Sequence, residues 1–370
     1  MSWAWRIATI AGIDVRIHVT FLALLAWIAW SAYSTTGTWA GALDGVVMIL
    51  LVFTIVVMHE FGHALMARRF GVKTRDITLL PIGGVASLER MPERPRDELL
   101  VAIAGPAVNV VLAAILATIA AILGLDLLPA SPVEPVSMLV RLVWINVALA
   151  VFNLLPAFPM DGGRALRALL AMKLSDRAAT RIAAQLGQAM AILFAIVGLF
   201  FNPMLMFIAL FLWMGASGEA KLAEAKWVAH GVPVASAMAR EVVAVPVAAT
   251  LAFALERTLD GFQRDFPVVG EGQVVGVLTR EAILRALATS GPDTPVIEVM
   301  KRGPRLLHPR DNLEDAFMKI LADNEPAPVV DDQGRLVGML TSDSLGEFLL
   351  VRTALEQSRQ HAAEARLSPS

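Results

Sequence analysis

The chain contains no cysteine. Disulfide bonds, thiolate zinc sites and cysteine-protease chemistry are therefore excluded, and the redox state of the compartment cannot be read from the sequence. Charge is also scarce, since only 17% of the residues are charged and the formal net charge is -2. A balance this close to neutral gives no electrostatic reason to expect a nucleic acid or a strongly acidic partner.

Hydrophobic residues make up 56% of the 370 residues, which is too apolar for an ordinary soluble protein of this size. We therefore expect a membrane protein, surrounded by a lipid bilayer. The first twelve residues contain only Arg6 as a positive charge and no small-residue cleavage site, so we predict no removable signal peptide. Apolar segments near the length of a membrane span predict six transmembrane helices. The predicted spans are residues 19–33, 41–66, 99–125, 138–155, 182–201 and 204–216.

Basic residues are distributed unevenly between the predicted loops. Residues 68–96 contain seven Lys or Arg, and the segment that follows Asp161 is also basic, whereas residues 34–40 and 126–137 contain none. Since Lys and Arg concentrate on the cytoplasmic side, we predict a multi-pass protein of the cell membrane with both termini in the cytoplasm.

Beyond Gly218 the long apolar segments give way to polar residues, turn signals and short β-branched runs. Residues 266–279 and 327–341 share one pattern, Phe/Ala-Pro-Val-Val followed by Val-Gly-Val/Met-Leu-Thr, which indicates an α/β unit repeated after about sixty residues. We therefore predict a membrane domain at 1–218, a linker at 219–231, repeats at 232–292 and 293–351, and a tail at 352–370.

A His-Glu-Phe-Gly-His run covers residues 59–63 at the inner end of the second predicted span. In a helix, residues four apart share one face, so His59 and His63 can reach one ion while Glu60 lies close to a water on it. Asp161, at the inner end of the fourth predicted span, offers the carboxylate that completes a two-imidazole, one-carboxylate set. The alternative is that these are polar residues at a helix end, but ionisable groups at membrane depth are costly and poorly explained by packing.

The sequence resembles the site-2 proteases, the membrane-embedded zinc metalloproteases of peptidase family M50. The motifs that carry the resemblance occur in the family's order and lie at residues 59–63, 81–84, 105–109 and 153–163. With the repeats behind them, the chain resembles the branch with C-terminal tandem cystathionine-β-synthase-type (CBS) domains. This implies a membrane α-helical bundle of six transmembrane helices with a short re-entrant β element, plus a cytoplasmic α/β tandem CBS domain.

The resemblance implies an intramembrane zinc endopeptidase that cuts membrane-protein substrates in regulated intramembrane proteolysis. One Zn²⁺ per chain would be held by His59, His63 and Asp161, with the active site toward the cytoplasmic side. Glu60 would accept a proton from the attacking water and later deliver it to the leaving amine.

Four further residues are candidates for substrate binding or oxyanion stabilisation. Asn109 and Asn153 match asparagines that the family associates with its active site, although interhelical packing also explains an amide in an apolar helix. Gly83 and Gly84 form the turn of a predicted strand-turn-strand element, whose open edge could pair with an unwound substrate. The alternative is a loop that only connects two helices.

CBS pairs in the family often bind adenine nucleotides through a Gly-x-x-Thr/Ser-x-x-Asp signature. Thr279 and Thr341 keep the hydroxyl, but Ala282 and Ser344 stand at the two carboxylate positions. The resemblance therefore implies at most a weak nucleotide site at Thr279 and Thr341, and a platform for a homodimer or for gating is an equal alternative.

Two other classes of protein remain open at this stage. A CBS-regulated transporter or channel also carries intramembrane polar residues, but they would be spread along a pore instead of forming one compact His/His/Asp set beside a glutamate. An inactive protease-like membrane adaptor would keep the fold without cleavage.

Overall fold

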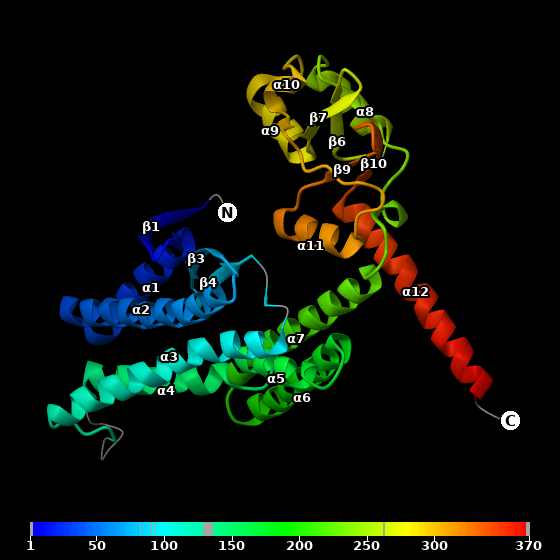
Figure 1. Ribbon diagram of the computed structural model, residues 1–370. Coiled ribbons are helices and arrows are strands. Elements are labelled where there is room, and N and C mark those ends of the chain that lie inside the picture. The colour runs from blue at the N-terminus through cyan, green and yellow to red at the C-terminus, as the bar shows by residue number, and fades with distance from the viewer. Residues whose placement is uncertain are drawn as a thin grey trace. The chain divides into compact units, whose positions relative to one another are not determined.

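The computed structural model describes residues 3–81, 83–89, 91–92, 94–128, 136–261 and 263–367. Ile82 of the predicted re-entrant element and the last three residues of the predicted tail lie outside this description. The chain forms two compact units, Met1–Lys221 and Leu222–Ser370 (Figure 1).

The first unit is built mainly from helices. They are α1 (Val19–Thr36), α2 (Trp39–Arg69), α3 (Pro95–Ile122), α4 (Met138–Asn153), α5 (Asp161–Ala171), α6 (Asp176–Phe200) and α7 (Met204–Ala229), of which α7 continues into the second unit. Ser137 and Ser175 cap α4 and α6, because each side-chain oxygen accepts from a backbone N–H three residues later.

Within the described residues, five helices are long and apolar enough to cross a membrane: α1, α2, α3, α6 and α7. The fourth predicted span corresponds to α4, which has only 16 residues. A helix of that length rises about 24 Å, less than the ~30 Å of a hydrocarbon core. The expected number of six crossings therefore stays a prediction.

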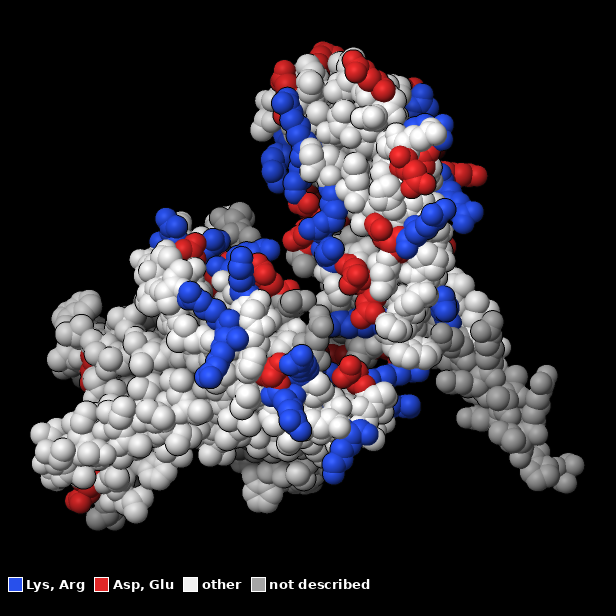
Figure 2. All heavy atoms as spheres, in the orientation of Figure 1, with Lys and Arg blue, Asp and Glu red and all other residues white. Residues whose placement is uncertain are grey.

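Charged side chains are absent from much of this unit. On the face drawn in Figure 2, the region of α3 and α4 is mostly white, whereas Lys and Arg gather around the sheet and α5. Arg141 of α4 is charged and pairs with Asp44. This distribution is typical of helices that lie in lipid and end in a polar layer.

A four-stranded sheet packs on α1 and α2. Its strands are β1 (Ala4–Ile10), β2 (Ile13–His18), β3 (Thr74–Leu80) and β4 (Gly83–Leu88), in that spatial order. Neighbouring strands are antiparallel except β2 and β3, which are parallel and are connected through α1 and α2. Ile13 and Ile77 form a buried cluster with Ala64 of α2. Two strands were predicted at β3 and β4, but Gly83 and Gly84, predicted to form the turn, lie in β4 and pair with Leu80 and Leu79. The N-terminal hairpin was not predicted.

Helix α3 lies unusually close to α2 because Gly62 has no side chain at their crossing. A Cβ atom at Gly62 would lie 2.8 Å from the backbone oxygen of Ala104, which cannot move aside. The glycine inside the His-Glu-Phe-Gly-His run therefore lets α3 reach the imidazoles on both sides of it.

The second unit contains the two α/β repeats. Its strands are β5 (Val245–Pro246), β6 (Phe266–Gly270), β7 (Gln273–Leu278), β8 (Lys301–Arg302), β9 (Ala327–Val330) and β10 (Leu336–Leu340). Its helices are η1 (Val234–Ser236), α8 (Leu251–Asp260), α9 (Arg280–Ser290), α10 (Val296–Val299), α11 (Leu313–Asp323) and α12 (Ser342–Leu367). Leu251 and Leu313, which match in the sequence repeat, are both fully buried in their own clusters.

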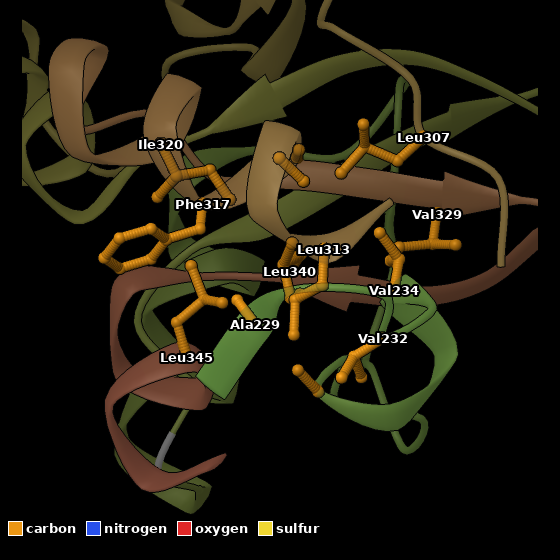
Figure 3. Close-up of a cluster of buried hydrophobic side chains, with 13 residues drawn as sticks. Ala229, Val232, Val234, Leu307, Leu313, Phe317, Ile320, Val329, Leu340 and Leu345 are labelled. Carbon is orange, nitrogen blue, oxygen red and sulfur yellow. The ribbon is translucent and has the colours of Figure 1, made fainter. Parts of the chain in front are cut away.

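The repeats exchange segments. Val232 and Val234, which precede the first repeat's strands, pack in the core of the second repeat with Leu313 and Val329 (Figure 3). In return, β8 pairs with β7 of the first repeat. Neither repeat therefore has a complete core without the other.

Candidate metal centre

Three polar side chains from two distant helices meet in the first unit. His59 and His63 lie one turn apart on α2, are 7% exposed, and hold their Nε2 atoms 3.1 Å apart. Asp161, the first residue of α5, places Oδ2 3.2 Å from each of these nitrogens. The sequence-predicted ligands thus form a nearly equilateral triangle that could hold a metal ion.

The size of this triangle fits zinc. Ligand atoms at 2.0–2.1 Å from a tetrahedral zinc ion are about 3.3 Å from one another, close to the three observed separations. Nitrogen and oxygen donors are also the types that zinc prefers in proteins.

The orientation of both imidazoles fits a metal as well. His63 Nδ1 lies 2.7 Å from the backbone oxygen of Val101, and His59 Nδ1 lies 2.5 Å from Oδ1 of Asn109. Since a carbonyl oxygen can only accept, each Nδ1 carries the hydrogen and donates it. Both Nε2 lone pairs are therefore available to a metal, which is the arrangement that partners of ligating histidines impose.

Gly105 of α3 borders the triangle. A Cβ atom at this position would overlap the His63 ring and lie 2.7 Å from His59 Nε2. The absence of a side chain here keeps the two nitrogens and the space beside them clear.

Asn109 is fully buried and uses both ends of its side chain. Its oxygen accepts from His59, and its nitrogen donates to Oδ1 of Asn146 at 3.3 Å. Asn146 is also fully buried and donates to the backbone oxygen of Leu142 at 2.9 Å. This chain of hydrogen bonds fixes the His59 ring from α4. Sequence reasoning missed Asn146, although an amide in the apolar segment 138–155 is the same signal that Asn109 carried.

Glu60 lies between the metal triangle and β4. The backbone of Ala86 in β4 lies near its carboxylate. A Cβ atom at Gly84 would lie 3.0 Å from Cγ of Glu60 and 3.0 Å from Val56, so glycine lets β4 approach α2. Gly83 has a φ of 136°, in a region that favours glycine. The two glycines are therefore required for different reasons.

Helix α5, which carries Asp161, is tied to α3 by a buried ion pair. Glu98 is 3% exposed, and both its oxygens accept from Arg167, with Nε at 2.8 Å. Val101, one turn after Glu98 on α3, accepts from His63. One turn of α3 therefore sets the position of Asp161's helix and the orientation of a histidine. A bidentate arginine–carboxylate pair fixes geometry better than a point charge does.

The remaining sequence-predicted residues do not join this cluster. Asn153 is the last residue of α4 and is half-buried. Thr279 and Thr341 lie in the second unit, where their hydroxyl oxygens accept from the backbone N–H groups of Ala282 and Ser344. Both threonines therefore cap helices.

A pocket in the second unit lies beside Thr279. Its lining includes the basic residues Lys301, Arg305 and Lys319. Glu325 and apolar side chains complete the lining. Glu325 pairs with Lys301. Thr341 is not among the lining residues.

Comparison with known proteins agrees with both units. Residues 47–134 and 129–194 match peptidase family M50, and residues 234–289 and 296–350 each match the CBS domain. A zinc metalloprotease of Methanocaldococcus jannaschii is 34% identical over 284 residues, which cover 75% of this chain and 78% of that protein. Stage IV sporulation protein FB of Bacillus subtilis is 30% identical over 140 residues, which cover 36% of this chain and 44% of that protein.

Among solved structures, a site-2 protease from Methanocaldococcus jannaschii is 34% identical with a TM-score of 0.44 and covers 59% of this chain and 95% of its own. The family match and the extent of the sequence similarity confirm the resemblance found from the motifs. The chain belongs to peptidase family M50 and carries a C-terminal pair of CBS domains.

The hydrogen bonds behind His59 predict a graded loss of zinc affinity. Asn109→Ala removes the acceptor of the His59 ring and should weaken zinc binding by roughly 10- to 100-fold, the usual cost of losing such a partner. Asn146→Ala removes only the next link and should cost less. Zinc dissociation constants would be measured by competition with a chromophoric chelator, with Thr118→Ala on an exposed turn of the same helix as control. Unchanged affinity in Asn109→Ala would contradict this role.

Proposed function

We propose that this protein is an intramembrane zinc endopeptidase that hydrolyses peptide bonds in or near the transmembrane segments of other membrane proteins. One observation carries the proposal. Asp161 lies 102 residues from His59 in the chain and meets both imidazoles. The imidazoles and Glu60 belong to α2, which is apolar enough to span a bilayer, and the chain belongs to peptidase family M50.

We propose His59, His63 and Asp161 as the ligands of one Zn²⁺ per chain. Three protein ligands are typical of catalytic zinc sites, whereas structural sites use four. When bound, zinc supplies a Lewis acid that activates a water molecule and polarises the scissile carbonyl.

Glu60 is the proposed general base and acid. It follows His59 directly on α2, so its carboxylate stays beside the ligands. A carboxylate offers several acceptor sites, so Glu60, beside Ala86, has the capacity to accept the proton of the attacking water. Glu60 then returns the proton to the leaving amine, which must be protonated before it departs.

The two asparagines receive different proposed roles. Asn109 is a positioning residue, since both ends of its side chain are occupied by His59 and Asn146. Asn153 is the proposed donor to the developing oxyanion or to the substrate backbone, at the end of α4 where the chain turns toward Asp161.

The open edge of β4 is the proposed substrate-binding element, and β3 and β4 together form the re-entrant β element. Only β3 pairs with β4 in the sheet. The Glu89 N–H bonds to Lys73 on the β3 side, so the alternation of a strand turns Gly84, Ala86 and Leu88 toward the open edge. Gly84 and Ala86 lie beside Glu60 there. An unwound substrate segment that pairs with this edge runs past Glu60, which supports β-augmentation as the binding mode.

The proposed topology has six spans, including the short α4, with both termini and the CBS pair in the cytoplasm and the active site toward that side. The basic loops and the scarcity of charge along α3 and α4 support it. The proposed domains are those expected from sequence: a protease domain at 1–218, a linker at 219–231, CBS repeats at 232–292 and 293–351, and a tail at 352–370.

The CBS pair is the proposed regulatory part, through adenine nucleotide, through homodimer formation, or both. The pocket beside Thr279 supports an anionic ligand through Lys319, while Lys301 and Arg305 are paired with Glu325 and Asp323. Ala282 and Ser344, at the two positions where the family signature has a carboxylate, favour weak binding of the ribose.

Glu60→Gln should lower cleavage by roughly 10²- to 10⁴-fold and keep the zinc, because it removes a proton acceptor but no ligand. Asp161→Asn should lower both zinc content and cleavage. Both would be measured with purified protein in liposomes, by elemental analysis and by cleavage of a membrane-anchored substrate. Absence of cleavage by the wild-type chain at full zinc content would instead favour a transporter or an inactive adaptor, and full activity of Glu60→Gln would exclude the assigned role.

Replacing both Gly83 and Gly84 by Val should strongly reduce turnover while zinc content stays unchanged. Valine at position 83 strains the backbone at its positive φ, and valine at position 84 pushes β4 away from α2, which misplaces the open edge. Helix-breaking residues next to the scissile bond of the substrate should restore part of the loss, because the substrate then unwinds by itself. Normal turnover in the double variant would rule out strand pairing at this edge.

Ala282→Asp should raise the affinity for AMP by about tenfold or more, because it restores a carboxylate that can accept from ribose hydroxyls. Titration calorimetry on the full chain would measure this, with Ala288→Asp on the exposed side of α9 as control. No binding by either variant would exclude the nucleotide and leave the dimer or gating role.

A further inference from the structure

The N-terminal hairpin exposes large apolar side chains that the proposed active site does not use. Trp3 is 66% exposed, Trp5 56% and Ile10 51%. Indoles are costly to leave in water, and tryptophan concentrates at membrane interfaces, where its ring is half in hydrocarbon and its N–H reaches polar groups.

Strand register places two of these side chains, Trp5 and Ile10, on one face of the sheet. Ile10 pairs with Ile13 and Trp5 pairs with Ile17. Directly opposed residues of antiparallel strands share a face. Ile13 is buried, and Ile17 packs against the cluster formed by α1, α2 and β3. Trp5 and Ile10 therefore lie on the face of the sheet that packs on the helices.

The opposite face of the hairpin carries polar side chains, and the exposed Ile7 lies at the irregularity between Arg6 and Ala8. Thr9 donates to Asp14 at 2.7 Å, and Arg6 pairs with the same carboxylate at 3.7 Å. The hairpin is thus amphipathic. On β2 and β3 the apolar face is covered by helices, but on β1 it extends beyond them and is uncovered.

The depth of the hairpin follows from its connection to α1. His18 ends β2 and caps α1, so no linker separates the sheet from the helix. The Val19 N–H donates to the backbone oxygen of Trp3 at 3.0 Å, which places Trp3 level with the first residue of a candidate span. Within that span only 6% of the residues are buried, so lipid reaches α1 directly below β1.

We propose that the β1–β2 hairpin is an interfacial anchor, with Trp3, Trp5 and Ile10 inserted into the boundary between lipid headgroups and acyl chains and with Arg6 and Thr9 facing water. The occupant of the uncovered face is thus the lipid surface that surrounds α1. The anchor holds the sheet, and with it β4 at its other edge, at a constant depth. This role is independent of peptide hydrolysis.

The cysteine-free chain allows a direct test with adjacent residues on opposite faces. Ile10→Cys and Thr9→Cys would each be labelled with a nitroxide in the full protein, reconstituted in phosphatidylcholine–phosphatidylglycerol liposomes. Collisions with oxygen, which concentrates in lipid, and with a water-soluble nickel chelate would be measured by electron paramagnetic resonance. We expect oxygen to dominate at position 10 and the nickel chelate at position 9. Trp5→Cys and Arg6→Cys provide a second matched pair with the same expectation.

Equal exposure of both faces to the nickel chelate would overturn the proposal. Protection of position 10 from both reagents, increasing with the protein-to-lipid ratio, would also overturn it, because a second copy of the chain would then cover this face. As a further check, Trp3→Ser combined with Trp5→Ser should shift the label at position 10 toward the nickel chelate. Since none of these measurements uses cleavage, their outcome is separate from that of the protease proposal.

Discussion

The close approach of α3 to α2 is the constraint on which the rest of the site depends. It requires Gly62, because any side chain there would collide with the backbone of α3. Once the helices are this close, Val101 and Asn109 reach the far nitrogens of both histidines, and Gly105 leaves the near nitrogens clear. Helix α3 contributes no ligand to the triangle, yet it orients two of the three. A metal site in a membrane helix thus depends on what packs behind it as much as on the ligands.

The buried polar groups around this site favour one arrangement of the helices over others, more than they raise the net stability of the fold. A buried ion pair such as Glu98–Arg167 gains little over apolar packing, because two charges must lose their water, but removal of one partner is strongly destabilising. The same holds for Asn109 and Asn146, which satisfy each other inside apolar helices. Such groups disfavour alternative registers of α3, α4 and α5, since every shift leaves a donor or acceptor unpaired. The position of Asp161 relative to the histidines depends on the register that these pairs favour.

The second unit follows a different principle, in which two similar sequences complete each other's cores. Val232 and Val234 pack in the second core, and β8 pairs with the first sheet. A repeat of this kind cannot change its shape without affecting its neighbour, because they share buried surface. This coupling fits the proposed regulatory role of the CBS pair.

Local chemistry allowed much of the molecule to be predicted. Apolar length indicated the long helices, the sequence repeat indicated two α/β units, and the spacing of His59 and His63 indicated one shared helical face, since all three depend on short-range periodicity. The hairpin of β1 was missed because its alternation of apolar and polar residues is short, as Trp5, Arg6 and Ile7 show. So short a pattern next to an apolar segment resembles the start of a membrane span. Asn146 was missed because one amide in an apolar segment does not reveal its partner.

The sequence by itself determined which side chains can bind a metal and which segments can enter lipid, because these are properties of residue types and of their spacing along one helix. Only the tertiary structure decided that the nitrogens of His59 and His63 and the oxygen of Asp161 lie 3.1–3.2 Å apart, and that Glu60 meets the edge of β4. Those distances depend on how closely α2, α3 and α5 pack. Packing is set by contacts between residues far apart in the chain, which no local pattern records.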